Sequence, residues 1–292
     1  MATRRTILAL LLGLLAAPAA AAETGKLPVV ASFSIIGDLV KEIGADRVLV
    51  STIVGPDGDA HVYQPTPADG RRIAQAKVIF VNGLGFEGWL ERLIAAAKSK
   101  GTVVTLGKGV KARSGEEGAD PHAWQDVANA KIYVKEIQDA LIAADPIGVE
   151  SYNARALAYL ARLDALDAEI VKTLDAIPKD RRRVVSTHDA FGYFAARYGV
   201  EFIAPQGVST EAEASARDIA RIIDAVKQNK VSAVFLENIA DPRLAKRIAA
   251  ETGAKVGGTL YSDALSEPTG DGANYIDMMR HNVRELSKAL AP

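Results

Sequence analysis

Short runs rich in valine and isoleucine alternate with amphipathic helical stretches along most of this 292-residue chain. Such alternation is typical of α/β units with mainly parallel strands. Strands are predicted at 28–33, 48–54, 78–82 and 102–106 in the first half, and at 183–187, 201–204, 233–237 and 255–260 in the second. Helices are expected between strands, for example at 86–98, 215–227 and 242–252.

The two halves resemble each other. The run VVASF at 29–33 precedes a predicted helix that ends in Ile43 and Gly44, and VVSTH at 184–188 precedes one that ends in Tyr198 and Gly199. The run VIFVN at 78–82 corresponds to AVFLE at 233–237. We expect two lobes of mainly parallel four-stranded sheet with flanking helices, at 23–150 and 178–292. The alternative is that any two α/β segments look this similar.

A long helix is predicted between the lobes, at 151–177. This segment has no glycine or proline before Pro178. Its apolar residues recur at spacings of three and four: Leu157, Leu160, Leu163, Leu166, Ile170 and Leu174. At about 1.5 Å per residue the helix spans roughly 40 Å, so we expect a stiff strut that permits little hinge closure. Residues 107–120 are glycine-rich and charged, without apolar periodicity, and are expected to form a mobile loop.

The N-terminal residues 1–22 have the features of a signal peptide: Arg4 and Arg5, a short apolar run at 7–15, and alanines at 20–22 before Glu23. The run is too short for a membrane span, which needs about 20 residues. Whether export follows the general secretory or the twin-arginine route stays open. The chain has no cysteine, so it lacks disulfides and a cysteine to carry a lipid. These features predict a periplasmic protein without a lipid anchor.

Charge excludes one class of partner. The 35 basic and 36 acidic residues nearly cancel, whereas nucleic-acid-binding proteins usually have a basic excess.

Three of the four histidines follow predicted strands. His61 and His122 come after the strands at 48–54 and 102–106, and His188 ends the strand at 183–187. The carboxyl ends of strands in open parallel sheets face the ligand crevice. A lone histidine is more often a surface or hydrogen-bonded residue, but the shared strand-end position favours convergence on one site. His281 lies in a predicted helix at 275–290 and is interpreted as structural or solvent-facing.

Lobe symmetry points to a fourth ligand. His122 follows the fourth strand of the first lobe, and Asp263 follows the fourth strand of the second. Three imidazoles and one carboxylate suit Zn²⁺, although Asp263 by itself could merely cap a turn. The candidates to orient the imidazoles are the carboxylates of Asp126, Asp189 and Glu237.

The motifs around these residues resemble the metal-binding solute receptors of ABC importers, the zinc and manganese class called cluster A-I. The similar runs are HVYQPTPAD at 61–69, DPHAWQD at 120–126, STHDAFGY at 186–193, EN at 237–238 with DPR at 241–243, and YSDAL at 261–265. The resemblance implies two α/β lobes, a rigid linking helix, and ligand roles for His61, His122, His188 and Asp263. Manganese members typically have glutamate at the position of His188, which favours zinc.

Two departures from the family pattern stand out. Val127 follows Asp126 where many relatives have proline, which predicts only a local change in the helix start. The loop before the second motif is short and has no histidine, so a histidine-based scavenging role for it is not expected.

The predicted function is capture of a divalent metal, foremost Zn²⁺ with Mn²⁺ or Fe²⁺ less favoured, and delivery to an ABC permease. We expect a monomer, with a periplasmic metal donor as a possible further partner. A zinc hydrolase is disfavoured, because a fourth protein ligand fills the open position and no His-Glu-x-x-His pattern occurs. An adhesin of the same fold remains the alternative outside transport.

Overall fold

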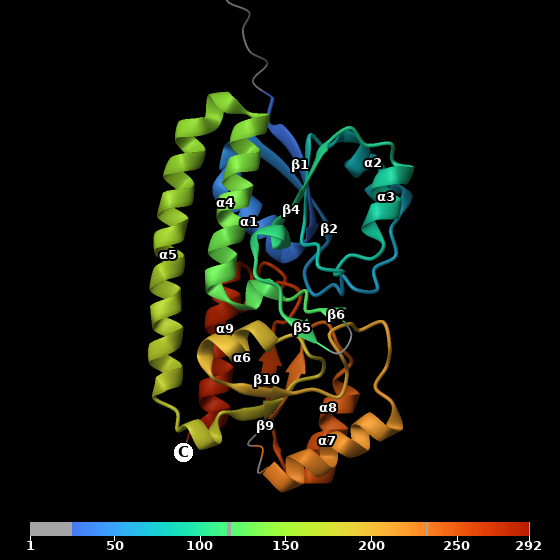
Figure 1. Ribbon diagram of the computed structural model, residues 1–292, viewed down its shortest axis with the longest axis vertical. Helices are drawn as coiled ribbons and strands as arrows, with labels where there is room; N and C mark the ends of the chain where they lie inside the picture. The colour runs from blue at the N-terminus through green and yellow to red at the C-terminus, as the bar shows by residue number, and fades with distance from the viewer. Residues whose placement is uncertain (1–24, 116–117, 230, 232, 292) are drawn as a thin grey trace, which may run out of the picture.

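The computed structural model describes residues 25–115, 118–229, 231 and 233–291. The predicted signal peptide at 1–22 lies outside this part of the chain. Two four-stranded sheets lie one above the other in Figure 1. The first contains β1 (Leu27–Phe33), β2 (Val48–Val54), β3 (Val78–Val81) and β4 (Thr102–Thr105). The second contains β7 (Arg183–Val185), β8 (Glu201–Ile203), β9 (Ala233–Glu237) and β10 (Lys255–Leu260).

The two sheets share one topology. Their strand orders are β2-β1-β3-β4 and β10-β9-β7-β8, so in each half the first strand pairs with the second and the third. All of these pairings are parallel, for example Val29 of β1 with Val50 and with Val78. The α/β class, the parallel sheets and the long helix predicted from the sequence are therefore confirmed.

The helices that flank the first sheet are α1 (Ser34–Gly44), α2 (Pro67–Gln75), α3 (Leu90–Ala96) and α4 (Val127–Ala144). Those of the second half are α6 (Gly192–Tyr198), α7 (Ala216–Asn229), α8 (Pro242–Thr252) and α9 (Tyr275–Leu290). Short 3₁₀ segments are η1 (Ala45–Arg47), η2 (Leu106–Gly109), η3 (Ala123–Gln125), η4 (Pro146–Gly148) and η5 (Lys179–Arg181). The local sequence determines where α2 begins, because Thr66 and Asp69 form a capping box around Pro67.

Helix α5 (Val149–Asp175) runs along one side of the molecule past both sheets (Figure 1). Its 27 residues span about 40 Å, as predicted. The buried stripe differs from the predicted one at its N-terminal end. Leu157 is 72% exposed, and the stripe there consists of Tyr152, Ala156 and Tyr159. The sequence pattern missed this because it counted only leucine and isoleucine.

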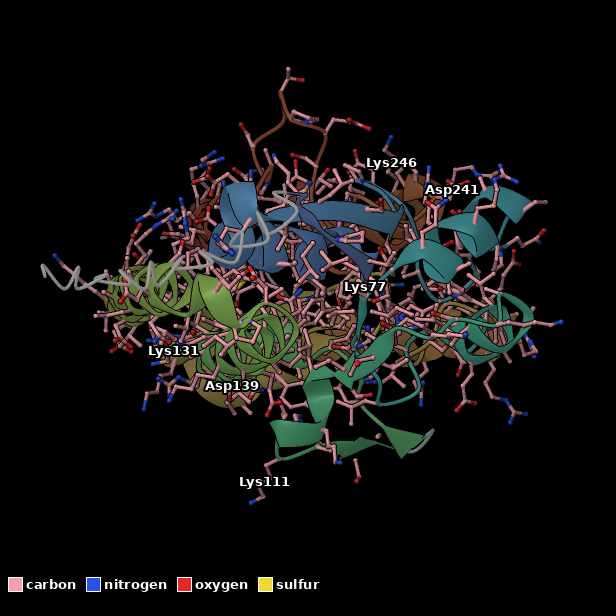
Figure 2. The ribbon with its side chains drawn as sticks, turned by 90° about the horizontal axis from the view of Figure 1, so that it is seen from above. Lys77, Lys111, Lys131, Asp139, Asp241 and Lys246 are labelled. Carbon is pink, nitrogen blue, oxygen red and sulfur yellow. The ribbon has the colours of Figure 1, made fainter. Side chains whose placement is uncertain are left out.

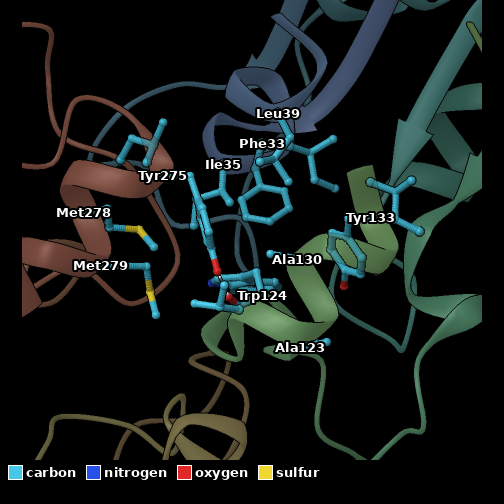
Figure 3. Packing of buried hydrophobic residues seen from close by; sticks show 14 of the residues in the cluster. Phe33, Ile35, Leu39, Ala123, Trp124, Ala130, Tyr133, Tyr275, Met278 and Met279 are labelled. Carbon is cyan, nitrogen blue, oxygen red and sulfur yellow. Dashed lines mark hydrogen bonds between the residues drawn. The ribbon is translucent and has the colours of Figure 1, made fainter. Parts of the chain in front are cut away.

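One large hydrophobic core extends through both halves of the chain. It contains residues of the first sheet and of α1, α4, α5 and α9, and Figure 3 shows Tyr275, Met278 and Met279 of α9 beside Trp124 and Ile35. A smaller core lies in the second half, between its sheet and helices α7 and α8, and includes Val185 and Ile248. Helix α9 therefore packs with the first half as well as with its own sheet.

The segment 107–120 is more regular than expected. It contains most of η2 and a hairpin of β5 (Ser114–Gly115) and β6 (Gly118–Ala119). The hairpin projects from the body of the molecule near Lys111 (Figure 2). Among the described residues, no helix combines the length and apolar character that crossing a membrane requires.

Candidate metal centre

The topology brings four chain segments to one place. His61 lies in the connection after β2, His122 between β6 and η3, His188 just after β7, and Asp263 just after β10. His61, His188 and Asp263 follow the carboxyl ends of the parallel strands β2, β7 and β10, where the crevice of an open sheet forms, and His122 reaches the same place from the long connection after β4. All four side chains are buried, and His122, His188 and Asp263 are fully so.

One ligand atom from each of these residues lies within 4.8 Å of the others. The Nε2 atoms of His61 and His122 are 3.3 Å apart. Asp263 Oδ2 lies 3.4 Å from His61 Nε2 and 3.1 Å from His188 Nε2, and Asp263 Oδ1 lies 3.5 Å from His122 Nε2. Zinc bonds of about 2.0–2.1 Å at tetrahedral angles place neighbouring ligand atoms about 3.3–3.4 Å apart. The spacing therefore fits one small cation.

Hydrogen bonding within the protein leaves this cluster unsatisfied. His188 Nε2 and both carboxylate oxygens of Asp263 are buried without a hydrogen-bond partner among the described residues. Buried polar atoms of this kind are costly unless another group pairs with them. A divalent cation would satisfy the imidazole lone pairs and the carboxylate together, so the donor set fits a transition metal.

Electrostatics keep the carboxylate ionised. Burial alone would raise the pKa of Asp263, but the nearby His188 and His122 outweigh it and place that pKa well below its usual value. Burial likewise lowers the pKa of His188, but Glu237 and Asp263 reverse the effect and raise it well above the usual value. The pKa of His122 is also raised, because Asp263 and Asp120 outweigh burial. Protons therefore compete with metal for these imidazoles.

Two carboxylates fix the orientation of imidazole rings. Glu237 Oε2 lies 2.6 Å from His188 Nδ1, while Glu237 Oε1 accepts hydrogen bonds from the backbone N–H groups of Thr187 and His188. Asp120 Oδ1 lies 2.9 Å from His122 Nδ1 and also accepts from the backbone N–H of His122. In both cases a carboxylate on Nδ1 leaves the Nε2 lone pair free for metal.

The other two carboxylates predicted from the sequence form no hydrogen bond to an imidazole among the described residues. Asp126 caps α4 by accepting from Ala128 N, and it faces Arg197 at 3.8 Å. Asp189 follows His188 but is exposed, and no hydrogen bond joins its carboxylate to an imidazole among the described residues. The role expected for Asp126 falls to Asp120, which the sequence reasoning missed. The available signal was the Asp-Pro-His run, because an aspartate side chain can accept a hydrogen bond from the backbone N–H two residues later.

Aromatic rings pack against two of the imidazoles. The ring of Phe86 lies 4.6 Å from that of His61, and the ring of Trp124 lies 5.3 Å from that of His122. The indole N–H of Trp89 donates to the carbonyl of Ala60 at 2.7 Å, which holds the backbone just before His61. A dry surround strengthens the interaction of a cation with its ligands.

His281 and Tyr63 bond to residues other than the four candidate ligands. His281 Nε2 lies 2.8 Å from the carbonyl oxygen of Thr259, and its other ring nitrogen faces Arg284 and Asp271. The hydroxyl of Tyr63 donates to Asp69.

Two α/β units whose strand ends bring three imidazoles and a carboxylate to one buried point define a metal-binding receptor. Residues 29–289 match the family described as ZnuA, zinc-uptake complex component A, periplasmic. The chain belongs to this family, the metal-binding substrate receptors of ABC transporters.

Similar proteins carry different metal names. The chain is 35% identical over 290 residues to the manganese-binding lipoprotein MntA of Halalkalibacterium halodurans, covering 97% of this chain and 96% of that protein. It is 35% identical over 267 residues to the iron-binding protein YfeA of Yersinia pestis, covering 90% and 86%. The solved structure of the periplasmic zinc-binding protein TroA from Treponema pallidum matches with a TM-score of 0.88 at 32% identity, over 92% of this chain and 100% of that one.

These relatives confirm the receptor class in place of an enzyme, because they are named as binding proteins. Their manganese and iron names do not support zinc over the other ions. Several are named lipoproteins, which contradicts the prediction of a protein without a lipid anchor, although this chain contains no cysteine.

Proposed function

We propose that the chain captures Zn²⁺ outside the cytoplasm through His61, His122, His188 and Asp263, and delivers it to the permease of an ABC importer. The observation that carries the proposal is the buried cluster of four ligand atoms within 4.8 Å of one another, with separations of 3.1–3.5 Å between Asp263 and the three imidazoles. Within the described part of the chain, His188 Nε2 and the Asp263 carboxylate have no hydrogen-bond partner, which supports the proposal.

Zinc is preferred over manganese for a chemical reason. A site of nitrogen and oxygen ligands binds zinc more tightly than manganese or ferrous iron in the usual order of divalent affinities. Three imidazoles strengthen that preference, because manganese suits carboxylate and carbonyl oxygens better. In the cell, metal availability also enters the choice.

A manganese or iron receptor is the second candidate. Both oxygens of Asp263 face the cluster, Oδ2 toward His61 and His188, and Oδ1 toward His122. A bidentate carboxylate would raise the coordination number above four, which suits ions that favour higher coordination. The names of MntA and YfeA support this candidate as well.

The remaining parts of the proposal concern organisation. Residues 23–150 and 178–292 would act as two lobes joined by the helix predicted at 151–177, with a signal peptide at 1–22 directing export. Relatives named as periplasmic or as lipoproteins support export. We further propose that the receptor works as a monomer and that a metal donor outside the cytoplasm supplies it.

The test is to purify the exported protein without added metal and to measure its metal content, and then to repeat this with His188→Ala. Near-stoichiometric zinc that is lost in the variant supports the proposal. Manganese or iron at that stoichiometry would replace zinc with the second candidate. A protein that binds none of these ions when titrated would overturn the receptor function altogether.

A further inference from the structure

The segment that carries Asp263 is supported differently from the imidazoles of His188 and His122. Glu237 orients His188, and Asp120 orients His122, each from the same half of the chain as its histidine. The backbone before His61 is held by Trp89 of its own half, while Asp59, which accepts from the backbone N–H of His61, also accepts from Thr210 of the second half. Asp263 belongs to the second half, but the carbonyl of the residue just before it accepts two hydrogen bonds from the first half.

The residue before Asp263 accepts two buried hydrogen bonds from the first half. The carbonyl oxygen of Ser262 accepts from Trp124 Nε1 at 2.8 Å and from Gln125 Nε2 at 2.6 Å. Ser262, Trp124 and Gln125 are all fully buried. The hydroxyl of Tyr275 donates to the carbonyl of Trp124 at 2.7 Å, which holds the segment that carries both donors. Figure 3 shows Tyr275 next to Trp124.

Further bonds to the first half follow Asp263. The backbone N–H of Leu265 donates to Ser34 Oγ at 2.9 Å, and the carbonyl of Leu265 accepts from the N–H of Asp57 at 2.9 Å. The second half also holds the segment on both sides of Asp263. Asn282 bonds to both backbone groups of Tyr261, two residues before Asp263, and Asn238 donates to Ala264 at 3.2 Å.

We propose that Gln125, together with Trp124, is a positioning residue for Asp263, so that the first half of the chain sets the place of a ligand that the second half carries. This inference rests on the proposed function. Because Trp124 and Gln125 come two and three residues after His122, one short segment fixes two ligands relative to each other. His188, by contrast, is oriented by Glu237 of its own half.

The test compares two matched substitutions that each replace a buried amide with an apolar side chain of similar length. Gln125→Met removes the donor to Ser262, and Asn282→Leu removes the bonds to Tyr261 from the other side of the same segment. Zinc affinity is measured by competition with a chromophoric chelator. The visible absorption of the Co²⁺ complex reports ligand geometry, and thermal unfolding of the metal-free protein reports stability.

We expect Gln125→Met to weaken zinc binding roughly ten-fold and to alter the Co²⁺ spectrum, while the metal-free protein unfolds near the wild-type temperature. Asn282→Leu is expected to lower that temperature and to leave the Co²⁺ spectrum and the affinity unchanged. Trp124→Phe, which keeps the ring and loses only the N–H, is expected to act in the direction of Gln125→Met.

Wild-type affinity and spectrum in both the Gln125 and Trp124 variants would overturn the inference. Equal losses of affinity in Gln125→Met and Asn282→Leu would also overturn it, since they would indicate general loosening of the segment. If Asn282→Leu does not fold, Asn282→Asp serves instead, because it keeps the acceptor for Tyr261 N. A wild-type protein that binds no zinc would overturn the proposed function, which is a different result from zinc binding that Gln125→Met leaves intact.

Discussion

Replacing Glu237 with glutamine should weaken metal binding although no ligand is altered. Glu237 accepts three hydrogen bonds, two from the backbone N–H groups of Thr187 and His188 and one from His188 Nδ1. A glutamine keeps the shape but has only one carbonyl oxygen. If that oxygen faces the backbone donors, the amide NH₂ faces Nδ1, and the imidazole must carry its proton on Nε2, the atom proposed to bind metal. If the amide is reversed, two backbone donors face an NH₂ group.

Either orientation of the glutamine amide is expected to weaken metal binding. Loss of an outer partner of a metal-binding histidine typically reduces affinity 10- to 100-fold, which is about 1.4–2.8 kcal/mol. We expect Glu237→Gln to lose zinc affinity within that range in a competition titration at pH 7.5, with unchanged stoichiometry.

The first half of the chain offers a matched control. Glu87 is also a buried carboxylate near a strand end, and it accepts from Ser32 Oγ, Asn82 N and Gly83 N without contacting an imidazole. Glu87→Gln should therefore keep wild-type zinc affinity, whatever it does to stability. Full affinity in Glu237→Gln, or an equal loss in both variants, would refute the orienting role of Glu237.

Four further outcomes are expected. Asp120→Asn should weaken zinc binding about ten-fold in the same titration, because Asp120 orients the ring of His122; unchanged affinity would contradict this. Zinc at about 1,000 times its dissociation constant should stabilise the folded protein by about 4 kcal/mol and raise the melting temperature by roughly 10 °C in a thermal scan, and a chelator should reverse the shift. Leu163→Ala should cost about 2–5 kcal/mol of unfolding free energy in urea, whereas the exposed Leu157→Ala should change it by less than about 0.5 kcal/mol; similar costs would refute the burial of the stripe. Burial raises the pKa of Asp38 from 3.8 to about 6, so the protonated carboxyl favours folding and the stability falls as pH rises through about 4 to 6. Asp38→Asn should flatten this dependence of stability on pH and add at most about 3 kcal/mol of unfolding free energy at pH 7.5. An unchanged pH dependence in the variant would exclude Asp38 as its source.

Strand positions could be predicted from the sequence because β-branched runs bounded by turn residues have few alternatives in an α/β chain. Their carboxyl ends were predicted less well. The expected strand at 78–82 ends at Val81, because the backbone N–H of Asn82 bonds to Glu87 instead of a neighbouring strand. The expected strand at 183–187 ends at Val185, since the N–H of Thr187 goes to Glu237.

The four proposed ligands could also be predicted from the sequence. Strand-end position and lobe symmetry identify His61, His122, His188 and Asp263, because parallel strands bring their carboxyl ends to a common edge. Contacts between the two halves cannot be predicted from strand-end position or lobe symmetry. Nothing in the spacing of Gln125 and Ser262, 137 residues apart, indicates that their amide and carbonyl meet.

Both tryptophans of the chain donate their indole N–H to the carbonyl of the residue just before a proposed ligand, Trp89 to Ala60 and Trp124 to Ser262. Tryptophan fluorescence of the unmodified protein should therefore report which kind of cation binds, without any added dye. Closed-shell zinc should leave the fluorescence largely unchanged, while paramagnetic manganese or copper should quench it. A single fluorescence titration would then distinguish the class of ion that is bound.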